Sequence, residues 1–312
     1  MSLVSVILPV YNQEKYIGET LTSILNQSFS DFELMVLDDG STDKSAQIIR
    51  EFAAKDKRIH AYFESNSGKS DSTNSLVNRA KGEWCIFLDA DDVMLPNRIE
   101  KQVAFHLSNP GVHASSAYCQ YINEKGNMFG VQRYSSPSNR FENKHAIPDD
   151  EFITCSYTAL MVAKNIFIQV GGLLKKYEPC EDFEFFNRFA DNGFVLSIIP
   201  EILMKYRIHP TAITVRKPVH VLNMINFVQH CLRLRRLGEE EISFEAFLAI
   251  QEGKSWWNKI NQRRFNYAMI FFRSAGLAML SKNYITFLWQ IIASSVLSPL
   301  YVLKKISNHT KI

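Results

Sequence analysis

Residues 84–92 are Trp-Cys-Ile-Phe-Leu-Asp-Ala-Asp-Asp, an apolar run that ends in acidic side chains. A short apolar run of this kind is typical of a buried strand. In extended backbone, residues i and i+2 project to the same side, so Asp89 and Asp91 should converge. Converging carboxylates repel each other unless a cation lies between them, and hard oxygen ligands favour Mg²⁺ or Mn²⁺. The alternative is a solvated acidic turn.

The residues before this run alternate between strand and helix patterns. Apolar runs at Val4–Val10, Phe32–Leu37 and Ile59–Phe63 predict three further strands, separated by apolar residues at helical spacing. Such alternation predicts an α/β fold with right-handed crossovers and a largely parallel sheet. Ligands of these sheets bind beyond the carboxyl ends of the strands. A second acidic pair, Asp38-Asp39, ends a predicted strand, so we expect both acidic clusters at that edge.

The second half of the chain is less regular. Residues 123–148 are polar and predict a loop or a short hairpin, whereas Glu181–Ala190 predicts a helix. Further strands are predicted at Ala159–Ala163, Phe194–Ile199 and Ile202–Ile208. Because helical patterns dominate beyond Pro218, we expect a catalytic domain at 1–218 and a C-terminal helical region at 219–312.

Other polar residues stand where chemistry is possible. The Asp38-Asp39 carboxylates can accept from a base N3–H or a ribose hydroxyl, which is compatible with helix capping by Ser41 or Asp43. Glu181-Asp182 opens a predicted helix, where the helix dipole favours the ionised form that a general base needs. A first-turn charge preference is the alternative. His209 follows a predicted strand and can bind a metal or a phosphate, or serve a structural role.

The sequence argues against a P-loop, a cysteine-based structural site and a secretory signal. Gly68-Lys69-Ser70 resembles the end of a P-loop, but position 63, where that motif needs glycine, is Phe63. The five cysteines are odd in number and form no Cys-x-x-Cys pair, which predicts neither a disulfide framework nor a zinc site and fits a reducing cytosol. The apolar run Leu3–Val10 lacks a basic flank and carries a proline, unlike a secretory signal.

Taken in order over residues 4–210, these motifs resemble those of the family 2 glycosyltransferases. The resemblance implies the GT-A fold, a Rossmann-like mixed, mainly parallel sheet flanked by helices. Each motif is short, but their shared order is specific. The segments that carry the resemblance are Val4–Asn12 (VSVILPVYN), Asp38–Asp43 (DDGSTD), Asn66, Gly68, Asn74, Phe87–Asp92 (FLDADD), Gly171-Gly172, Glu181-Asp182, Arg188, Arg207 and His209.

The resemblance implies inverting sugar transfer from a nucleotide-diphosphate sugar, assisted by Mn²⁺ or Mg²⁺. It makes Asp182 the base that takes the proton of the acceptor hydroxyl, and Glu181 a residue that positions donor or acceptor. Asp91 would bind the metal directly, and Asp89 and His209 are further candidate ligands. The residues implied at the nucleotide sugar are Pro9, Tyr11, Asn12, Asp38, Asp39, Gly68, Asn74, Asp89, Ala90, Arg188 and Arg207.

Two positions differ from common patterns of that family. Thr73 stands before Asn74 where the family often has arginine, which leaves one diphosphate or loop contact in doubt. Processive members usually carry Gln-x-x-Arg-Trp, whereas here Gln262-Arg263-Arg264 is followed by Phe265. The addition of a single sugar is therefore favoured.

The charge is distributed unevenly along the chain. The 312 residues carry a net charge of +3, but residues 253–312 hold nine Lys or Arg and no acidic residue, which leaves −6 for residues 1–252. Three of the four tryptophans and a stretch without charge at 283–303 lie in this basic tail. The mixture predicts attachment to an anionic membrane surface on the cytosolic side. A packed helix pair and a membrane span are alternatives, and the long apolar runs argue against nucleic acid.

Three functions remain open when the residues are taken together with the resemblance. We expect a glycosyltransferase that acts on a glycan or lipid-linked acceptor in surface polysaccharide synthesis. Its C-terminal helices could join copies of the chain into a homo-oligomer. A non-catalytic nucleotide-sugar binder is the second hypothesis, although it would need neither Asp91 nor Asp182. A nucleotidyltransferase is the third, but residues 10–13 (Val-Tyr-Asn-Gln) offer no triphosphate-binding loop.

Overall fold

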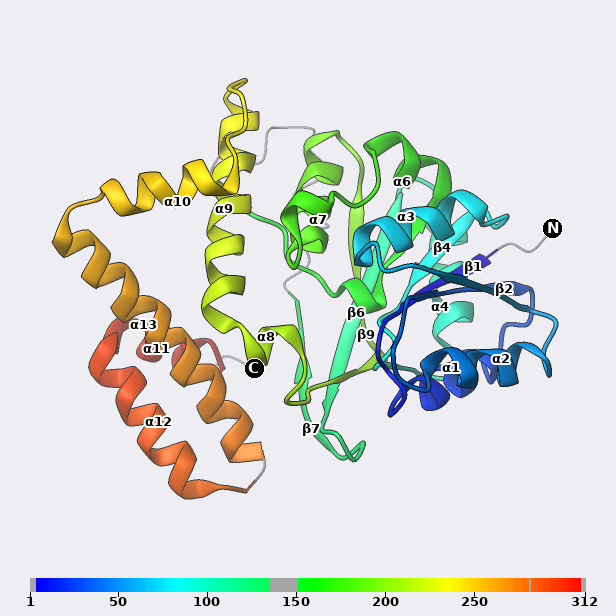
Figure 1. Cartoon of the computed structure of the whole chain (residues 1–312), viewed down its shortest axis with the longest axis horizontal. Coiled ribbons are helices and arrows are strands. Elements are labelled where there is room, and N and C mark those ends of the chain that lie inside the picture. The colour runs from blue at the N-terminus through cyan, green and yellow to red at the C-terminus, as the bar shows by residue number, and fades with distance from the viewer. Residues whose placement is uncertain (1–3, 135–150, 281, 310–312) are drawn as a thin grey trace. The chain divides into compact units, whose positions relative to one another are not determined.

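A computed structural model describes residues 4–134, 151–280 and 282–309. In this part of the chain nine strands form one mixed sheet in the order β3-β2-β1-β4-β8-β6-β9-β5, with β7 paired to β6 off this path (Figure 1). The strands are β1 (Val4–Val10), β2 (Phe32–Asp39), β3 (Ile59–Glu64), β4 (Trp84–Phe87), β5 (Val93–Met94), β6 (Ala114–Ile122), β7 (Met128–Gln132), β8 (Met161–Ala163) and β9 (Leu196–Arg207).

Helices connect these strands and continue beyond them. In the first part they are α1 (Ile17–Leu25), α2 (Ser45–Ala53), α3 (Lys69–Arg79), α4 (Arg98–Ser108), α6 (Lys164–Val170) and α7 (Glu181–Asp191), with 3₁₀ turns η1 (Tyr157–Ala159) and η2 (Lys175–Tyr177). Further along are α8 (Ile213–Arg216), α9 (Pro218–Arg236), α10 (Phe244–Gly253), α11 (Trp256–Leu280), α12 (Tyr284–Leu297) and α13 (Pro299–His309).

The first four predicted strands are confirmed, and they are parallel. β1 pairs in parallel with β2 on one side and with β4 on the other, and β2 pairs in parallel with β3. The carboxyl ends of β1, β2 and β4 therefore meet at one edge of the sheet. Both acidic clusters follow these ends, as the alternation of strands and helices predicts.

The later strands differ from the prediction in several places, since β5 was not predicted and the strand predicted at Ala159–Ala163 begins at Met161. β6 was not predicted, because its sequence Ala-Ser-Ser-Ala-Tyr-Cys-Gln-Tyr-Ile has no apolar run, although Ser115 and Ser116 are fully buried. The two strands predicted at 194–208 are one strand, β9. Its register to β6 jumps from Ile199 to Ile202, so that Pro200 and Glu201 bulge out exposed. A proline that cannot donate to the ladder is tolerated at such a bulge.

The polar segment 123–148 is partly a hairpin, because β7 runs antiparallel to β6. Residues 135–150 of that segment lie outside the described residues. β8 is antiparallel to both β4 and β6 and joins the two halves of the sheet.

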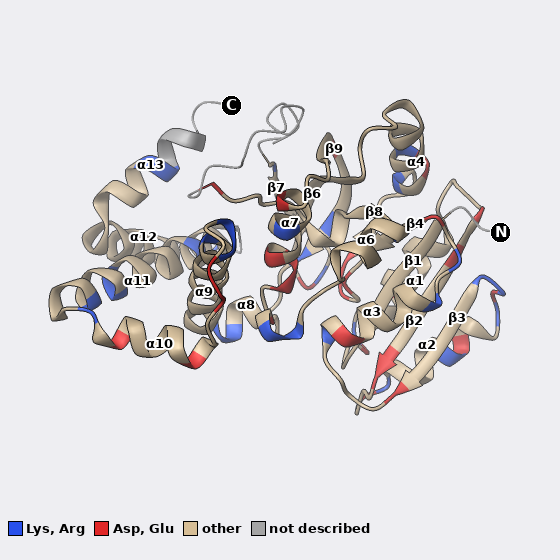
Figure 2. Cartoon of the chain, turned by 90° about the horizontal axis from the view of Figure 1, so that it is seen from above, with Lys and Arg blue, Asp and Glu red and all other residues tan. Residues whose placement is uncertain are grey.

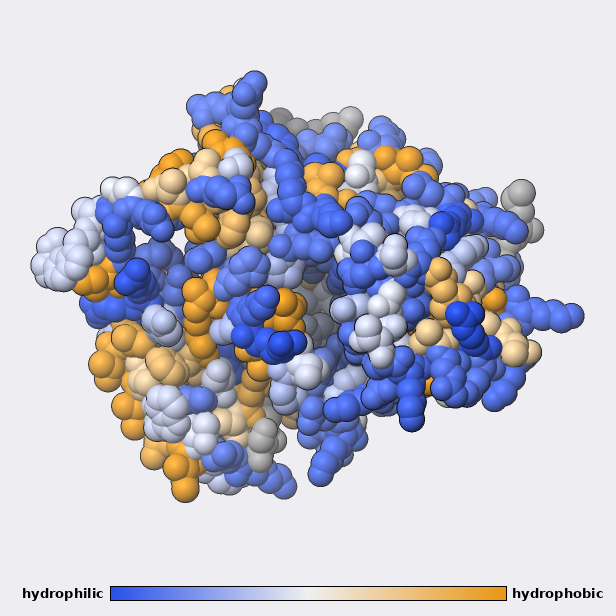
Figure 3. Space-filling model, viewed as in Figure 1, coloured by the Kyte–Doolittle hydropathy of each residue, from blue (hydrophilic) through white to orange (hydrophobic). Residues whose placement is uncertain are grey.

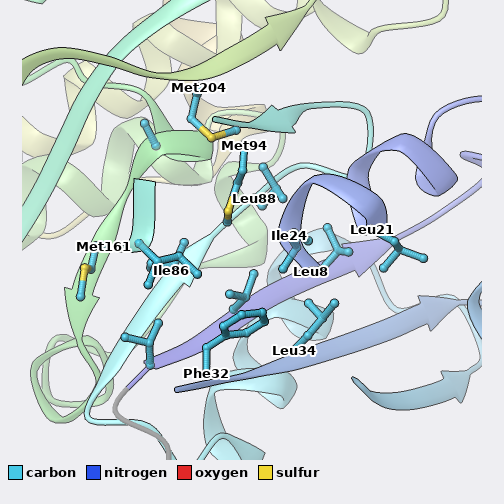
Figure 4. Close-up of a cluster of buried hydrophobic side chains, with 14 of the residues drawn as sticks. Leu8, Leu21, Ile24, Phe32, Leu34, Ile86, Leu88, Met94, Met161 and Met204 are labelled. Carbon is cyan, nitrogen blue, oxygen red and sulfur yellow. The ribbon is translucent and has the colours of Figure 1, made fainter. Parts of the chain in front are cut away.

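Apolar residues cover both faces of the sheet. On β1, Val6 and Leu8 belong to one buried cluster, which includes Leu21 of α1, whereas Ile7 belongs to a second, which includes Phe185 of α7. Figure 4 shows the first cluster, with Leu8, Leu21 and neighbouring side chains packed together. Helices on both faces therefore fix the strand ends that carry the polar loops.

The chain divides into two compact units. One comprises residues 1–212 with 228–239, and the other comprises 213–227 with 240–312. The second unit is helical, and α11 and α12 form a hairpin with ring contacts such as Phe271 to Trp289 (Figure 1). Among the described residues, no helix combines the length and the apolar content that crossing a bilayer requires.

Candidate active site

The loops after β1 and β2 are tied together at the sheet edge. The Asn12 backbone N–H donates to Ser41 Oγ (2.9 Å), and Asn12 Oδ1 accepts from the Thr42 backbone N–H (2.8 Å). Asn12 has a φ of 53°, a left-handed conformation that asparagine tolerates better than most residues. Pro9 is half-buried and Tyr11 is exposed next to this junction. A wall of the predicted nucleoside pocket is thus held in place.

The two carboxylates that end β2 have different surroundings. Asp39 Oδ1 accepts from the Ser67 N–H (2.8 Å) and its Oδ2 from the Gly68 N–H (3.0 Å), so this side chain holds the loop that enters α3. Asp38 Oδ2 accepts from the Ser41 N–H (3.2 Å). Asp38 Oδ1 is buried and has no hydrogen-bond partner among the described residues. Asp38 therefore keeps an unused acceptor, whereas Asp39 fixes the loop.

The acidic residues after β4 each have a separate partner. Asp89 Oδ1 lies 2.7 Å from Lys69 Nζ, and Asp91 Oδ2 lies 2.7 Å from His209 Nε2. Asp92 is buried, and burial together with the neighbouring acidic side chains raises its pKa well above its usual value. Asp89 and Asp91 are partly exposed whereas Asp92 is not, so of these three carboxylates they are the two that a ligand can reach.

Arg207 fixes the backbone of this acidic loop. Its Nε donates to the Asp91 carbonyl (2.8 Å), its Nη2 to Glu19 Oε2 (2.6 Å), and its backbone N–H to Asp92 Oδ1 (2.7 Å). The Ala90 carbonyl accepts from Thr20 Oγ1 (3.0 Å). The implied contact of Arg207 with the diphosphate stays a prediction, since these contacts make it a positioning residue for Asp91.

Lys69, which the sequence did not single out for this site, joins its two acidic groups. It is the first residue of α3, and its Nζ lies 2.7 Å from Asp89 Oδ1, 3.5 Å from Glu181 Oε1 and 4.1 Å from the centre of the Tyr157 ring. Thr73 Oγ1 lies 3.4 Å from the same tyrosine hydroxyl. The three partners of Lys69 come from segments 20 or more residues away, so no local sequence pattern could predict this role of Lys69.

The Glu181-Asp182 pair opens α7 as predicted. Glu181 is buried, and burial raises its pKa to about 7, although the Lys69 ammonium acts in the opposite direction. Burial also raises the pKa of Asp182, against the effect of Lys69 and of the Phe183 N–H, which donates to Asp182 Oδ1 (2.7 Å). Asp182 is partly exposed, whereas Glu181 is not. Raised carboxyl pKa values are typical of acid–base sites.

Lys69→Met is expected to move the acidic limb of the pH–rate profile upward by about one pH unit, since losing an adjacent opposite charge disfavours the carboxylate. The Lys69 ammonium lowers the pKa of both Asp182 and Glu181, so without it both should rise further and activity near pH 6 should fall more than activity near pH 8. The pH dependence of kcat/KM measures this. Lys101→Met, which removes a partly exposed lysine paired with Glu201, is the matched control and should leave the profile in place. An unshifted limb in Lys69→Met would contradict the coupling.

Asn74 and Arg188 hold the turn that precedes α7. Asn74 donates from Nδ2 to the Leu173 carbonyl (2.8 Å) and accepts at Oδ1 from the Leu173 N–H (2.9 Å). Arg188 donates to the Gly172 carbonyl (2.6 Å) and pairs with the fully buried Glu184 (Nε to Oε1, 2.9 Å). A side chain at Gly172 would meet Asn74 Oδ1 at 2.4 Å. Their implied contacts with the donor stay predictions, and their observed contacts position backbone.

Arg188→Met is expected to cost roughly 3 kcal/mol of unfolding free energy, because it removes one partner of a buried ion pair. Arg235 still pairs with Glu184 Oε1 (2.9 Å), which keeps the cost at the lower end. Urea denaturation measures the loss. Arg79→Met breaks an exposed pair with Glu64 and should cost about 1 kcal/mol or less. Unchanged stability with weakened donor binding would instead make Arg188 a donor contact.

Asp91 and His209 offer metal-ligating atoms that fit a metal bound together with a phosphate-bearing ligand. Across the described ranges, no cluster of three or more His, Cys, Asp or Glu side chains is arranged to hold a metal ion. Asp91 Oδ2 and His209 Nε2 are 2.7 Å apart and share a hydrogen bond, so a metal would take the place of the shared proton. Mg²⁺ is usually bound by one or two carboxylates together with substrate phosphates. The pair therefore suits a divalent cation completed by a diphosphate.

The sequence profile of glycosyl transferase family 2 matches residues 5–167, just over half of the chain. The chain belongs to glycosyl transferase family 2. It is 34% identical over 213 residues to the uncharacterized glycosyltransferase MJ1057 of Methanocaldococcus jannaschii, a match covering 66% of this chain and 71% of that protein. The family members are enzymes, and the resemblance stated from the motifs is confirmed.

Two further relatives are named for surface polysaccharides. The putative teichuronic acid biosynthesis glycosyltransferase TuaG of Bacillus subtilis is 38% identical over 117 residues, 37% of this chain and 46% of that protein. The O-antigen biosynthesis glycosyltransferase WbnJ of Escherichia coli is 29% identical over 213 residues, 67% of this chain and 81% of that protein.

Solved structures confirm the GT-A fold. S. aureus TarS 1–349 in complex with UDP-GlcNAc superposes with a TM-score of 0.60 at 18% identity, covering 94% of this chain and 91% of that one. The mannosyltransferase PcManGT of Pyrobaculum calidifontis, in complex with GDP-Man and Mn²⁺, gives 0.55 at 17% identity, covering 94% and 86%.

Proposed function

We propose that this glycosyltransferase moves one sugar, with inversion, from a UDP-sugar to a hydroxyl of a glycan or lipid-linked acceptor in surface polysaccharide synthesis. The observation that carries the proposal is that Asp89, Asp91, His209 and Glu181-Asp182 lie together at one edge of the sheet. The names of TuaG and WbnJ support the polysaccharide, and the complexes of TarS and PcManGT support a nucleotide-sugar donor.

Asp182 is the proposed base. A base must come within hydrogen-bond reach of the acceptor hydroxyl, and Asp182 is partly exposed while Glu181 is buried beside Lys69. Burial raises the pKa of Asp182, which makes its carboxylate a better proton acceptor than an ordinary aspartate. Direct attack of the deprotonated hydroxyl on the anomeric carbon expels the nucleotide and inverts that carbon.

The departing diphosphate gains negative charge as its bond to the sugar breaks. Asp91 and His209 would hold a divalent metal, which would supply charge neutralisation at that group when bound. Arg207 holds the Asp91 backbone for this purpose, and Lys69 keeps Asp89 and Glu181 in place. Asp38 and the Asn12 loop would receive the nucleoside, Asp38 through its unused Oδ1.

We also infer that the basic region 253–312 attaches the enzyme to an anionic membrane surface on the cytosolic side. Nine Lys or Arg without a single acidic residue favour such a surface, each contributing about 1 kcal/mol near anionic lipid. A lipid-linked acceptor would then lie in the same plane as the enzyme.

A nucleotide-release assay over a set of UDP- and GDP-sugars, with Mn²⁺ or Mg²⁺ present, tests the reaction. We expect release from at least one UDP-sugar, stimulated by metal and by acceptor. Donor binding without any turnover across acceptors would favour the non-catalytic sugar-nucleotide binder instead.

A further inference from the structure

Helix α12 exposes apolar side chains where a helix in water usually exposes polar ones. Its described exposed residues are all apolar, namely Tyr284, Ile285, Leu288, Trp289, Ile292 and Val296. Its polar residues are turned away from solvent. Ser294 is fully buried and donates to the Ala268 carbonyl of α11 (2.7 Å), and Ser295 donates to the Ile291 carbonyl of its own helix (2.8 Å). A helix that faces only water shows the opposite arrangement.

The exposed apolar residues form one continuous stripe. Ile285, Trp289, Ile292 and Val296 follow the spacing i, i+4, i+7 and i+11, which places them on one side of the helix. Ile285 is 85% exposed and Val296 71%. We call the exposed apolar residues of α12 the α12 face. Leu300 and Leu303 of the next helix, α13, are also exposed. Hydrophobic side chains gather over α12 in Figure 3.

The charges around this face are of one sign. Figure 2 shows no charged segment on α12 itself, while Lys282 precedes it and Lys304 and Lys305 lie on α13, all three exposed. An apolar stripe with a cationic border is complementary to anionic headgroups over acyl chains. A second copy of the chain is less suited, because a two-fold contact would bring these like charges together.

We propose that the α12 face is the part of the enzyme that enters an anionic bilayer surface. The 14 residues of α12 make a rod of about 21 Å, which lies in the interfacial plane with its apolar side down. The inference rests on the membrane attachment proposed above, and it assigns that attachment to specific side chains. The basic border supplies long-range attraction, and the α12 face supplies the part that salt does not screen.

Flotation of the full chain with vesicles tests the proposal. Wild-type protein should float with vesicles of phosphatidylcholine and phosphatidylglycerol, and high salt should release it only in part. The triple variant Ile285→Ser, Ile292→Ser, Val296→Ser should lower the vesicle partition coefficient by about 100-fold. These residues are exposed, so circular dichroism and donor turnover should be unchanged. The control triple Leu107→Ser, Met128→Ser, Ile168→Ser removes exposed apolar residues from the first unit and should float like wild type.

The outcomes separate the two levels of the proposal. Wild-type protein that fails to float overturns membrane attachment altogether. Wild-type and triple variant that float equally would overturn only the role of the α12 face. A triple variant that changes from dimer to monomer in sedimentation, without a change in flotation, would assign the face to a second copy.

Discussion

Asp91→Ala is expected to abolish metal-dependent donor binding and to lower turnover by at least about 1,000-fold, since several kcal/mol of charge stabilisation at the leaving diphosphate is lost. The Asp91 side chain has His209 as its partner, and its backbone carbonyl, which Arg207 holds, is unchanged by the substitution. The fold should therefore persist. Calorimetry with UDP and Mn²⁺, with and without a chelator, measures the effect.

The chelator comparison makes this result specific. In wild type, donor affinity should fall when the metal is removed, and in Asp91→Ala it should already be low and insensitive to chelator. Asp56→Ala removes a carboxylate that pairs only locally with Arg58 and should behave as wild type. Equal donor affinity in wild type with and without chelator would remove the metal from the proposed mechanism.

The strands that could be predicted well are those whose buried residues form a short continuous apolar run. β1, β2 and β3 are short β-branched or aromatic runs between helices, so period and length suffice to place them. β6 lies in the middle of the sheet and is rich in serine, and its burial depends on Ser115 and Ser116 finding partners such as His106 and the Ser156 carbonyl. His106 lies nine residues before Ser115 on helix α4, and Ser156 lies 40 residues after Ser116, so the apolar pattern of the strand itself contains neither partner.

The motifs could not predict which polar side chains of the candidate site contact each other. Asp91 and His209, 118 positions apart, share a hydrogen bond, and their implied role as metal ligands stays a prediction. Asn74, Arg188 and Arg207, however, use their polar atoms to hold backbone, a role that a motif does not distinguish from ligand contact. Lys69 lies in a segment that resembles only the end of a P-loop, and its three partners are 20 or more residues away, so the sequence could not predict its place in the site.

Asp182→Asn is expected to lower kcat by about 100- to 10,000-fold, the usual contribution of a general base, with donor affinity unchanged. The amide keeps an oxygen that can accept from the Phe183 N–H, as Asp182 Oδ1 does, so the start of α7 should be preserved. What it loses is the ability to take a proton. Single-turnover kinetics and donor titration on the same sample separate these two properties.

Glu181→Gln is the matched variant that decides between the neighbouring carboxylates. Glu181 is buried and faces Lys69, so its amide should raise KM and disturb the pH profile more than it lowers kcat at the optimum. The partly exposed Asp182 should show the reverse, a loss in kcat alone. If Asp182→Asn keeps more than about a tenth of the wild-type kcat while Glu181→Gln does not, the base is Glu181. Lys69 would then be the group that tunes it, because the same ammonium that lowers the pKa of Glu181 would set the pH at which the carboxylate can accept a proton.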